Sequence, residues 1–296
     1  MADGQALFDA AAGKLRGVDA TPDPAAAREL FRQAAATGRI DATVVYCNFL
    51  AAGVGGPREW SAALRLLASL AEVNPRSGAE LALIEGMALT PEGEPTDVPP
   101  GEPLCDAPAI TRFAGLFSPA ECAYLRAAAA PMLEPAVVID QRTGRQMRDK
   151  VRICDSVGFT APLENPAVHA LNRRIAAASG MPAEHGEPLQ VLRYEPGGEY
   201  RPHFDAIPGF ANQRVATMLV WLSEDYQGGE THFPTPGLKL KGAVGDAILF
   251  RNTGHDGRRD PHSGHAGLPV TAGEKLIASR WIRARPFEMP AGDRAG

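Results

Sequence analysis

The sequence predicts an α+β protein: an all-helical N-terminal region followed by a β-sandwich or jelly roll with flanking helices. Two observations lead to this prediction. Residues 1–90 are rich in Ala and Leu at helical spacing, whereas the later part carries short apolar runs separated by Gly and Pro turns. Regularly spaced short strands with turn residues between them are typical of sandwiches and jelly rolls. A linker rich in Pro and Glu at 91–104 separates the two regions, so we expect the second domain to cover 105–290.

The N-terminal region has the pattern of paired helices. Helices are expected at 24–38, 42–51 and 58–71, and the apolar pattern of the first recurs in the third. Helix pairs that recur in this way indicate a short α-solenoid. The run Ala51-Ala-Gly-Val-Gly-Gly56 with the following Trp60 resembles Sel1-like repeats, relatives of the tetratricopeptide repeat. A plain helical bundle is the alternative.

Local signals place the elements of the second domain. Ser118, Pro119 and Glu121 form the signature of a capped helix start, which predicts a helix over 118–129. A second helix is expected over 166–179. Strands are expected at 189–194, 216–222, 238–240, 247–250 and 276–282.

Composition and charge narrow the class of protein. The chain has 296 residues and a net charge of −5, which argues against a nucleic acid as the main partner. The Arg and Lys residues at 142–152 are expected to lie in a solvated loop. The four cysteines lack CxxC spacing and predict neither a zinc site nor a disulfide framework. Because neither a signal peptide nor a membrane-spanning apolar run is evident, we expect a cytoplasmic protein without membrane contact.

His203 and Asp205 are the first candidates for metal ligands. At positions i and i+2 of an extended segment, the two side chains point to the same side. His265 supplies a second imidazole. Two His and one carboxylate leave three positions open on an octahedral metal, the arrangement of non-haem Fe(II) oxygenases. The sequence therefore predicts an iron site at these three residues.

Lys275 is the candidate anchor for an acidic co-substrate. The turn at 271–273 separates it from His265, and we expect a hairpin that places the Lys strand beside the His strand. A buried ammonium pairs more strongly with a carboxylate than an exposed one does. A solvent-facing lysine is the alternative, but Leu276 and Ile277 indicate a buried strand.

Other histidines compete for these roles. His262 lies shortly before His265, and we expect it to face solvent or a substrate-facing loop. His232 is expected to be a structural strand residue. No chemical role is expected for His169 or His185, which lie in the helical part.

The motifs of the second domain carry a family resemblance. They are His203-Phe-Asp205, Gly228-Gly-Glu-Thr231, and His265-Ala-Gly-Leu-Pro-Val270 with Lys275 downstream. Residues 105–287 resemble the catalytic domain of the prolyl 4-hydroxylase group of 2-oxoglutarate- and Fe(II)-dependent dioxygenases. The resemblance implies a double-stranded β-helix (jelly-roll) oxygenase core.

The resemblance also implies two sets of site residues. The metal ligands, which are the catalytic residues, are His203, Asp205 and His265. The residues implied to hold the co-substrate are Lys275, Tyr194, Thr217 and Trp281. Fe(II), 2-oxoglutarate and O2 are the implied cofactors, with L-ascorbate as a reductant that rescues oxidised iron. The presence of Asp205 favours hydroxylation over halogenation.

The implied activity is hydroxylation of a protein or peptide residue, with proline as the candidate target and release of succinate and CO2. Hydroxylation of a free amino acid or another small molecule is an alternative. A non-catalytic scaffold that binds a partner through its repeats is an alternative of another class. The helical repeats are expected to recruit a protein substrate. One departure from the family pattern bears on the choice of proline: Arg152-Ile-Cys154 stands where the family has Arg-Thr-Ser. Residues 140–150, rich in Arg, Gln, Asp and Gly, are expected to form a mobile lid.

Overall fold

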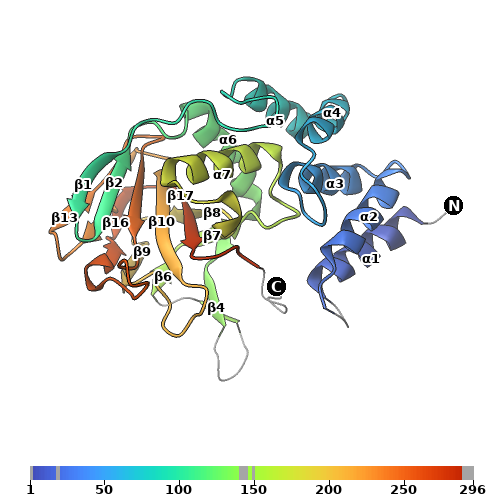
Figure 1. The fold of residues 1–296 in the computed structure, drawn as a ribbon. Helices are drawn as coiled ribbons and strands as arrows, with labels where there is room; N and C mark the ends of the chain where they lie inside the picture. Colours follow the sequence, from blue (N-terminus) through green and yellow to red (C-terminus); the bar gives the residue numbers. More distant parts are fainter. Residues whose placement is uncertain (1–2, 18–20, 140–145, 149–150, 289–296) are drawn as a thin grey trace. The chain divides into compact units, whose positions relative to one another are not determined.

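The structure, a computed structural model, describes residues 3–17, 21–139, 146–148 and 151–288, and its chain divides into two compact units (Figure 1). The first unit comprises Met1–Asp97, Phe159–Arg173 and Glu288–Gly296, and the second comprises Val98–Gly158 and Arg174–Phe287. Most of the expected lid lies outside the described residues. Its described part is strand β5 (Gln146–Arg148), which pairs with β4 (Val137–Ile139).

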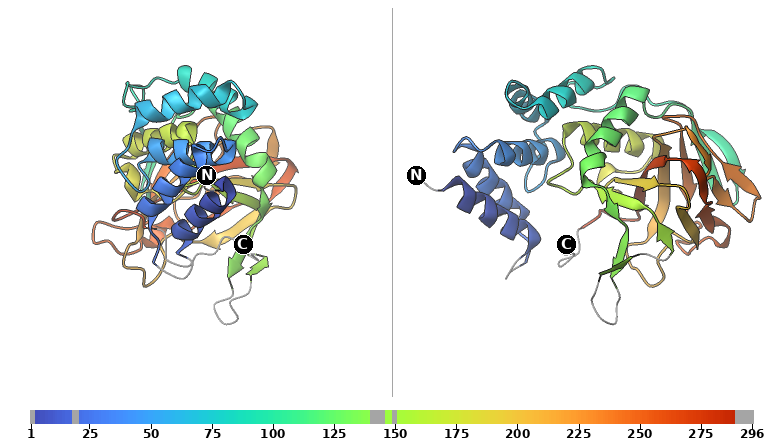
Figure 2. Two further views of the ribbon diagram at one scale, coloured as in Figure 1. Left: turned by 90° about the vertical axis from the view of Figure 1, so that its right-hand side faces the viewer. Right: turned by 180° about the vertical axis from the view of Figure 1, so that it is seen from behind.

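The first unit is built from helices that each contact the next along the chain (Figure 2). An aromatic core joins the first three of these helices. The rings of Phe8 and Phe49 both pack edge to face against Phe31, with centroid distances of 5.3 and 5.4 Å. The succession of neighbouring helices agrees with a repeat region, but the Sel1-like assignment stays a prediction. The helices are α1 (Gly4–Arg16), α2 (Pro24–Ala35), α3 (Ile40–Ala52), α4 (Trp60–Ala71) and α5 (Pro75–Glu85).

The second unit contains a large antiparallel sheet of eight strands. In spatial order the sheet runs β1-β2-β14-β10-β17-β8-β7-β3, and all neighbours are antiparallel. Its strands are β1 (Glu102–Asp106), β2 (Ala109–Phe113), β3 (Glu134–Pro135), β7 (Asp155–Gly158), β8 (Gln190–Tyr194), β10 (Arg214–Trp221), β14 (Ala247–Arg251) and β17 (Lys275–Arg283).

A smaller antiparallel sheet runs β13-β12-β15-β9-β6. Its strands are β6 (Arg152–Ile153), β9 (Glu199–His203), β12 (Thr231–Phe233), β13 (Leu238–Leu240) and β15 (His265–Gly267). A separate pair joins β11 (Tyr226–Gly228) to β16 (Val270–Gly273). Side chains of both sheets share one buried core, in which Phe233 of the small sheet meets Phe250 of the large one. Two antiparallel sheets around one core make this unit a jelly roll.

Helix α6 (Pro119–Ala129) packs against the large sheet at β8. Its start is the capping box that the sequence predicts, with Ser118 and Glu121 each bonding the other's backbone amide. Helix α7 (Pro166–Ser179) begins in the first unit and ends in the second. Within the described residues there are also short 3-10 helices at Ala130–Met132, Ala183–His185 and Pro261–Ser263.

The predicted fold class is confirmed, and one expected connection is wrong. The strand that begins with Lys275 does not pair with the strand of His265. It pairs with β8 and β10 in the large sheet, whereas β15 pairs with β9 and β12 in the small one. The intervening segment forms β16, whose partner is β11, so the expected hairpin is replaced by a crossing from one sheet to the other.

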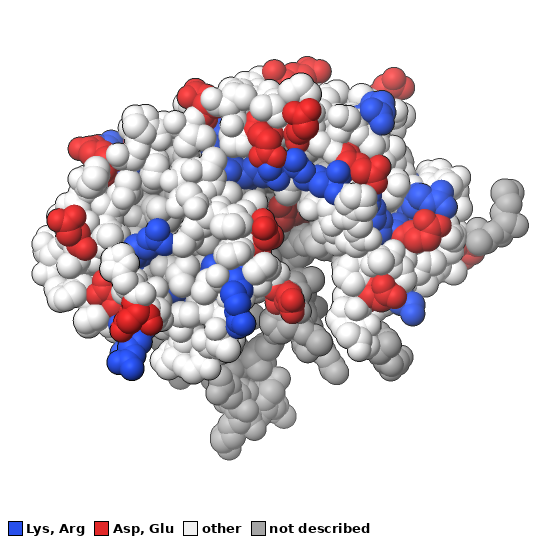
Figure 3. Space-filling model, viewed as in Figure 1, with Lys and Arg blue, Asp and Glu red and all other residues white. Residues whose placement is uncertain are grey.

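No helix in the described part of the chain is both long and apolar enough to cross a bilayer. On the face drawn in Figure 3, basic and acidic side chains lie side by side. This mixture agrees with the modest net charge of −5.

Candidate metal centre and co-substrate pocket

The two predicted histidine ligands are direct neighbours across two strands. His203 ends β9, His265 begins β15, and the two are paired in register. Their ring centroids lie 4.3 Å apart. Antiparallel pairing therefore brings together two imidazoles that are far apart in the sequence.

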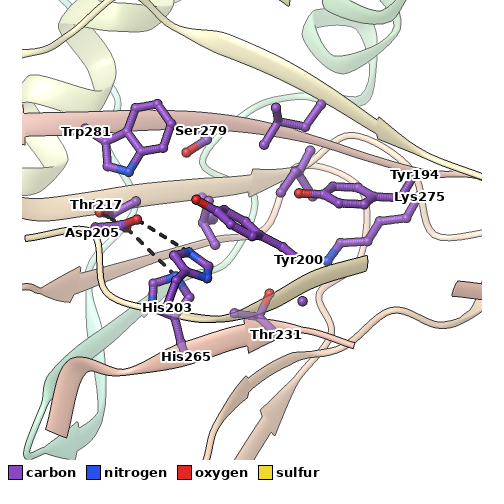
Figure 4. A pocket seen from close by; sticks show the side chains of 14 residues that line it. Tyr194, Tyr200, His203, Asp205, Thr217, Thr231, His265, Lys275, Ser279 and Trp281 are labelled. Carbon is purple, nitrogen blue, oxygen red and sulfur yellow. Dashed lines mark hydrogen bonds and ion pairs between the residues drawn. The ribbon is translucent and has the colours of Figure 1, made fainter. Parts of the chain in front are cut away.

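Asp205 lies just beyond the end of β9, so the extended segment is shorter than the sequence suggests. Its carboxylate nevertheless faces both imidazoles: Oδ1 is 3.6 Å from His203 Nε2, and Oδ2 is 3.9 Å from His265 Nε2 (Figure 4). The intervening Phe204 turns outward and is partly exposed. One ligand atom from each of the three residues lies within 4.8 Å of the others.

The hydrogen bonds of the two histidines prepare them to bind a metal. His203 Nδ1 is 2.8 Å from the carbonyl oxygen of Arg201, and His265 Nδ1 is 3.0 Å from that of Ser263. Because a carbonyl only accepts, each Nδ1 carries the proton and each Nε2 keeps its lone pair. His203 Nε2 is buried and has no hydrogen-bond partner among the described residues. An orphaned lone pair beside a carboxylate is what a divalent cation would satisfy, so these residues fit Fe(II).

Burial and neighbouring polar groups together determine the charges of His265 and Asp205. Burial lowers the pKa of His265 to about 4, although Asp205 opposes this, so the imidazole is neutral near pH 7. Burial opposes ionisation of Asp205, but the two imidazoles and the Thr217 hydroxyl hold the pKa of that carboxyl well below its usual range. The site therefore offers a metal ion the neutral imidazole of His265 and the anionic carboxylate of Asp205.

Lys275 occupies the other end of the same cavity (Figure 4). Its side chain is buried, and Nζ donates to the carbonyl of Gly229 at 2.7 Å. Burial lowers its pKa to about 8, and the charge of Glu230 opposes this only in part. A buried ammonium held by a neutral carbonyl is poorly compensated, so an anionic ligand group there would stabilise it.

The three other predicted pocket residues also line this cavity. Tyr194 is paired in register with Lys275, whose Nζ lies 5.4 Å from the centroid of its ring. Trp281 presents a buried indole N–H that has no partner among the described residues. The Thr217 hydroxyl lies 2.6 Å from Asp205 Oδ2, so the structure ties this residue to the metal end of the cavity.

Two other histidines considered as candidates, His262 and His232, do not line this cavity. His262 sits exposed on the 3-10 helix Pro261–Ser263, and His232 lies in β12. Tyr200 and Thr231 are among the cavity-lining residues that were not identified from the sequence. The ring of Tyr200 stacks on His203 with centroids 3.4 Å apart. No sequence pattern predicts that Tyr200 stacks on His203. Thr231 belongs to the Gly228-Gly-Glu-Thr231 motif, but nothing in that motif marks it as a cavity residue.

Comparison of the sequence with known proteins identifies a family and several relatives. The model of the 2OG-Fe(II) oxygenase superfamily matches residues 189–283. Prolyl 4-hydroxylase 1 of Arabidopsis thaliana is 40% identical over 198 residues, which cover 60% of this chain and 70% of that protein. Prolyl 4-hydroxylase subunit alpha-1 of Rattus norvegicus is 33% identical over 194 residues, 62% of this chain and 36% of that protein. A viral collagen prolyl hydroxylase from Paramecium Bursaria Chlorella virus-1, solved with 2OG, has a TM-score of 0.49 and 31% identity, and covers 62% of this chain and 99% of that one.

Fold and site together define a non-haem iron oxygenase built on a jelly roll. The chain belongs to the 2-oxoglutarate- and Fe(II)-dependent oxygenase superfamily, and its curated relatives include prolyl 4-hydroxylases. It is a dioxygenase of the hydroxylase type that uses Fe(II), 2-oxoglutarate and O2.

Proposed function

We propose that this protein hydroxylates proline residues in a protein or peptide and couples this reaction to the conversion of 2-oxoglutarate and O2 to succinate and CO2. The observation that supports it best is one cavity with His203, Asp205 and His265 at one end and Lys275 at the other. The choice of proline rests on the 40% identity to a prolyl 4-hydroxylase.

Each end of the cavity has its own task in this proposal. The three ligands would hold Fe(II), which when bound supplies oxygen activation. Lys275 would hold the far carboxylate of 2-oxoglutarate and so orient its keto-acid end toward the metal. The aromatic walls Tyr194 and Trp281 would keep water from the reacting groups.

In the family pattern an Arg-Thr-Ser run helps to enclose the peptide, and this chain keeps its arginine, Arg152. Arg152 stacks over Tyr200, its guanidinium carbon 5.7 Å from the ring centroid, so it lies near the metal end of the cavity. Ile153 and Cys154 replace the Thr-Ser of the family pattern. We include in the proposal that helices α1 to α5 recruit an intact protein substrate, which the succession of neighbouring helices supports.

The test is succinate formation from 2-oxoglutarate in the presence of Fe(II), with a proline-rich peptide, with free proline and with no second substrate. We expect peptide-stimulated turnover and a peptide that gains one oxygen by mass spectrometry. His265→Ala should abolish turnover, and His262→Ala is the matched control that should retain it, because His262 lies outside the cavity. Stimulation by free proline alone would overturn the peptide assignment. A lower KM for an intact protein than for its isolated peptide would support recruitment, and equal values would refute it.

A further inference from the structure

Asn252 is a fully buried polar residue directly after β14, and it carries no role in the chemistry described above. Its side-chain Nδ2 donates to Thr217 Oγ1 at 2.9 Å. Thr217 Oγ1 in turn lies 2.6 Å from Asp205 Oδ2. A chain of two hydrogen bonds therefore leads from Asn252 to the carboxylate of the metal site.

The chemistry of the three groups fixes the direction of this chain. An amide nitrogen donates and does not accept, so the Thr217 oxygen must accept from Asn252. The single hydroxyl hydrogen of Thr217 then remains for Asp205, whose ionised carboxylate only accepts. If the amide were turned over, its oxygen would compete with Asp205 for that hydrogen. By donating to the Thr217 oxygen, Asn252 reinforces the orientation in which the hydroxyl hydrogen of Thr217 is directed at Asp205.

We propose that Asn252 is a positioning residue for the metal centre: through Thr217 it occupies one oxygen of Asp205 and leaves the other, Oδ1, as the metal ligand. Oδ1 is the oxygen that lies 3.6 Å from the unpartnered His203 Nε2. Oδ2 is the oxygen that accepts from the Thr217 hydroxyl, at 2.6 Å. Hydrogen-bonded partners of this kind orient ligands and raise metal affinity.

The backbone of Asn252 reaches a second ligand by another route. Its carbonyl accepts from the backbone N–H of Asp260 at 3.0 Å, and the hydroxyl of Ser263 lies 3.4 Å away. The carbonyl of Ser263 accepts from His265 Nδ1 at 3.0 Å. Residue 252 is therefore linked to two of the three ligands, and only the link to Asp205 depends on its side chain.

The test is the affinity of the full chain for Co(II), followed by calorimetry and by the visible absorption of the bound ion. Asn252→Leu should raise the dissociation constant about tenfold or more and change the absorption spectrum. Thr217→Val should do the same, whereas Thr217→Ser should keep near wild-type affinity because it keeps the hydroxyl. The double variant should bind no worse than Thr217→Val alone, because Asn252 acts through Thr217.

Two controls separate positioning from folding. Asn48→Leu removes a buried asparagine of similar burial, whose Nδ2 donates to the carbonyl of Pro162 at 2.8 Å, and should leave Co(II) affinity unchanged. Thermal unfolding without metal identifies any variant that fails to fold. If Asn252→Leu does not fold, Asn252→Asp takes its place, since its carboxylate would draw the Thr217 hydrogen away from Asp205 and weaken binding.

The outcomes are distinct. This inference rests on the proposed iron site, and a wild-type chain that binds no Co(II) would refute that site and the inference with it. Two outcomes would refute the inference alone, provided that the wild-type chain binds Co(II). One is a folded Asn252 variant that binds Co(II) as tightly as the wild type. The other is a double variant in which the effects of the Asn252 and Thr217 substitutions on Co(II) affinity simply add.

Discussion

At the scale of single residues, the role that we propose for Lys275 predicts that the affinity for 2-oxoglutarate depends on pH. Its pKa is lowered to about 8 by burial, and only the protonated form can pair with a carboxylate. The ammonium is present below this pKa and is lost as the pH rises through it. We therefore expect the KM for 2-oxoglutarate to rise about tenfold per pH unit above about pH 8, measured by succinate formation.

Lys275→Arg is the matched variant for this prediction. A guanidinium stays charged over the whole range, so this variant should show no such rise even if its KM is higher throughout. Lys275→Met should raise the KM at every pH, by about 100-fold, because it removes the buried partner of the carboxylate. Parallel pH profiles for the wild type and the arginine variant would show that another group causes the dependence.

The site residues that could be identified from the sequence are those that belong to a motif with defined spacing. His203, Asp205, His265 and Lys275 stand in a pattern that can be read along the chain, and the structure brings all four to one cavity. Asn252 could not be identified in this way. The role that we propose for it rests on a contact between the end of β14 and β10, and no local pattern encodes which buried asparagine faces which threonine.

At the scale of elements, α6 depends on one carboxylate that has two tasks. Glu121 Oε2 accepts from the backbone N–H of Ser118 at 2.7 Å and from Arg174 Nη1 at 2.6 Å. Both charged side chains are buried. Glu121→Gln leaves the Arg174 charge without its counter-ion and should destabilise α6 by about 3 kcal/mol.

Ser118→Ala provides the comparison, since it removes only the cap on the Glu121 amide and should cost about 1 kcal/mol. Amide hydrogen exchange in peptides that cover Pro119–Ala129 measures both effects on this helix alone. If the two variants cost the same, the ion pair with Arg174 contributes nothing beyond the cap.

Elements with local signals were predicted well, and those set by distant partners were not. The capping box fixes the start of α6, and apolar runs locate β10 and β17 to within two residues. Strand β1 was missed because its Pro and acidic residues read as linker, although β2 holds it in the sheet. The prediction of a hairpin between His265 and Lys275 was wrong. A turn limits which strands can pair, but it does not determine which sheet each of the two flanking strands joins.

At the scale of the whole molecule, helix α7 contributes residues to both units, so we expect the stability of both units to depend on this segment. Residues 159–173 belong by their contacts to the first unit, yet α7 continues into the second. Within the first unit, Glu80 accepts from the Ala167 amide at 3.2 Å, and Asn48 Nδ2 donates to the Pro162 carbonyl at 2.8 Å. A chain cut at the linker would leave this segment in place without the helices that hold it.

We therefore expect a chain that begins at Val98 to be less stable than the full chain, and not an independent catalytic domain. It would lose the contacts to Ala167 and Pro162 and the ion pair between Glu94 and Arg173. Losses of this size lower the melting temperature by about 10 °C and expose apolar side chains, which thermal unfolding and dye binding would detect. Asn48→Leu in the full chain loses one of these contacts and should shift the melting temperature by a smaller amount in the same direction. A truncated chain with the melting temperature and turnover of the full protein would show that residues 159–173 are held by the catalytic unit itself.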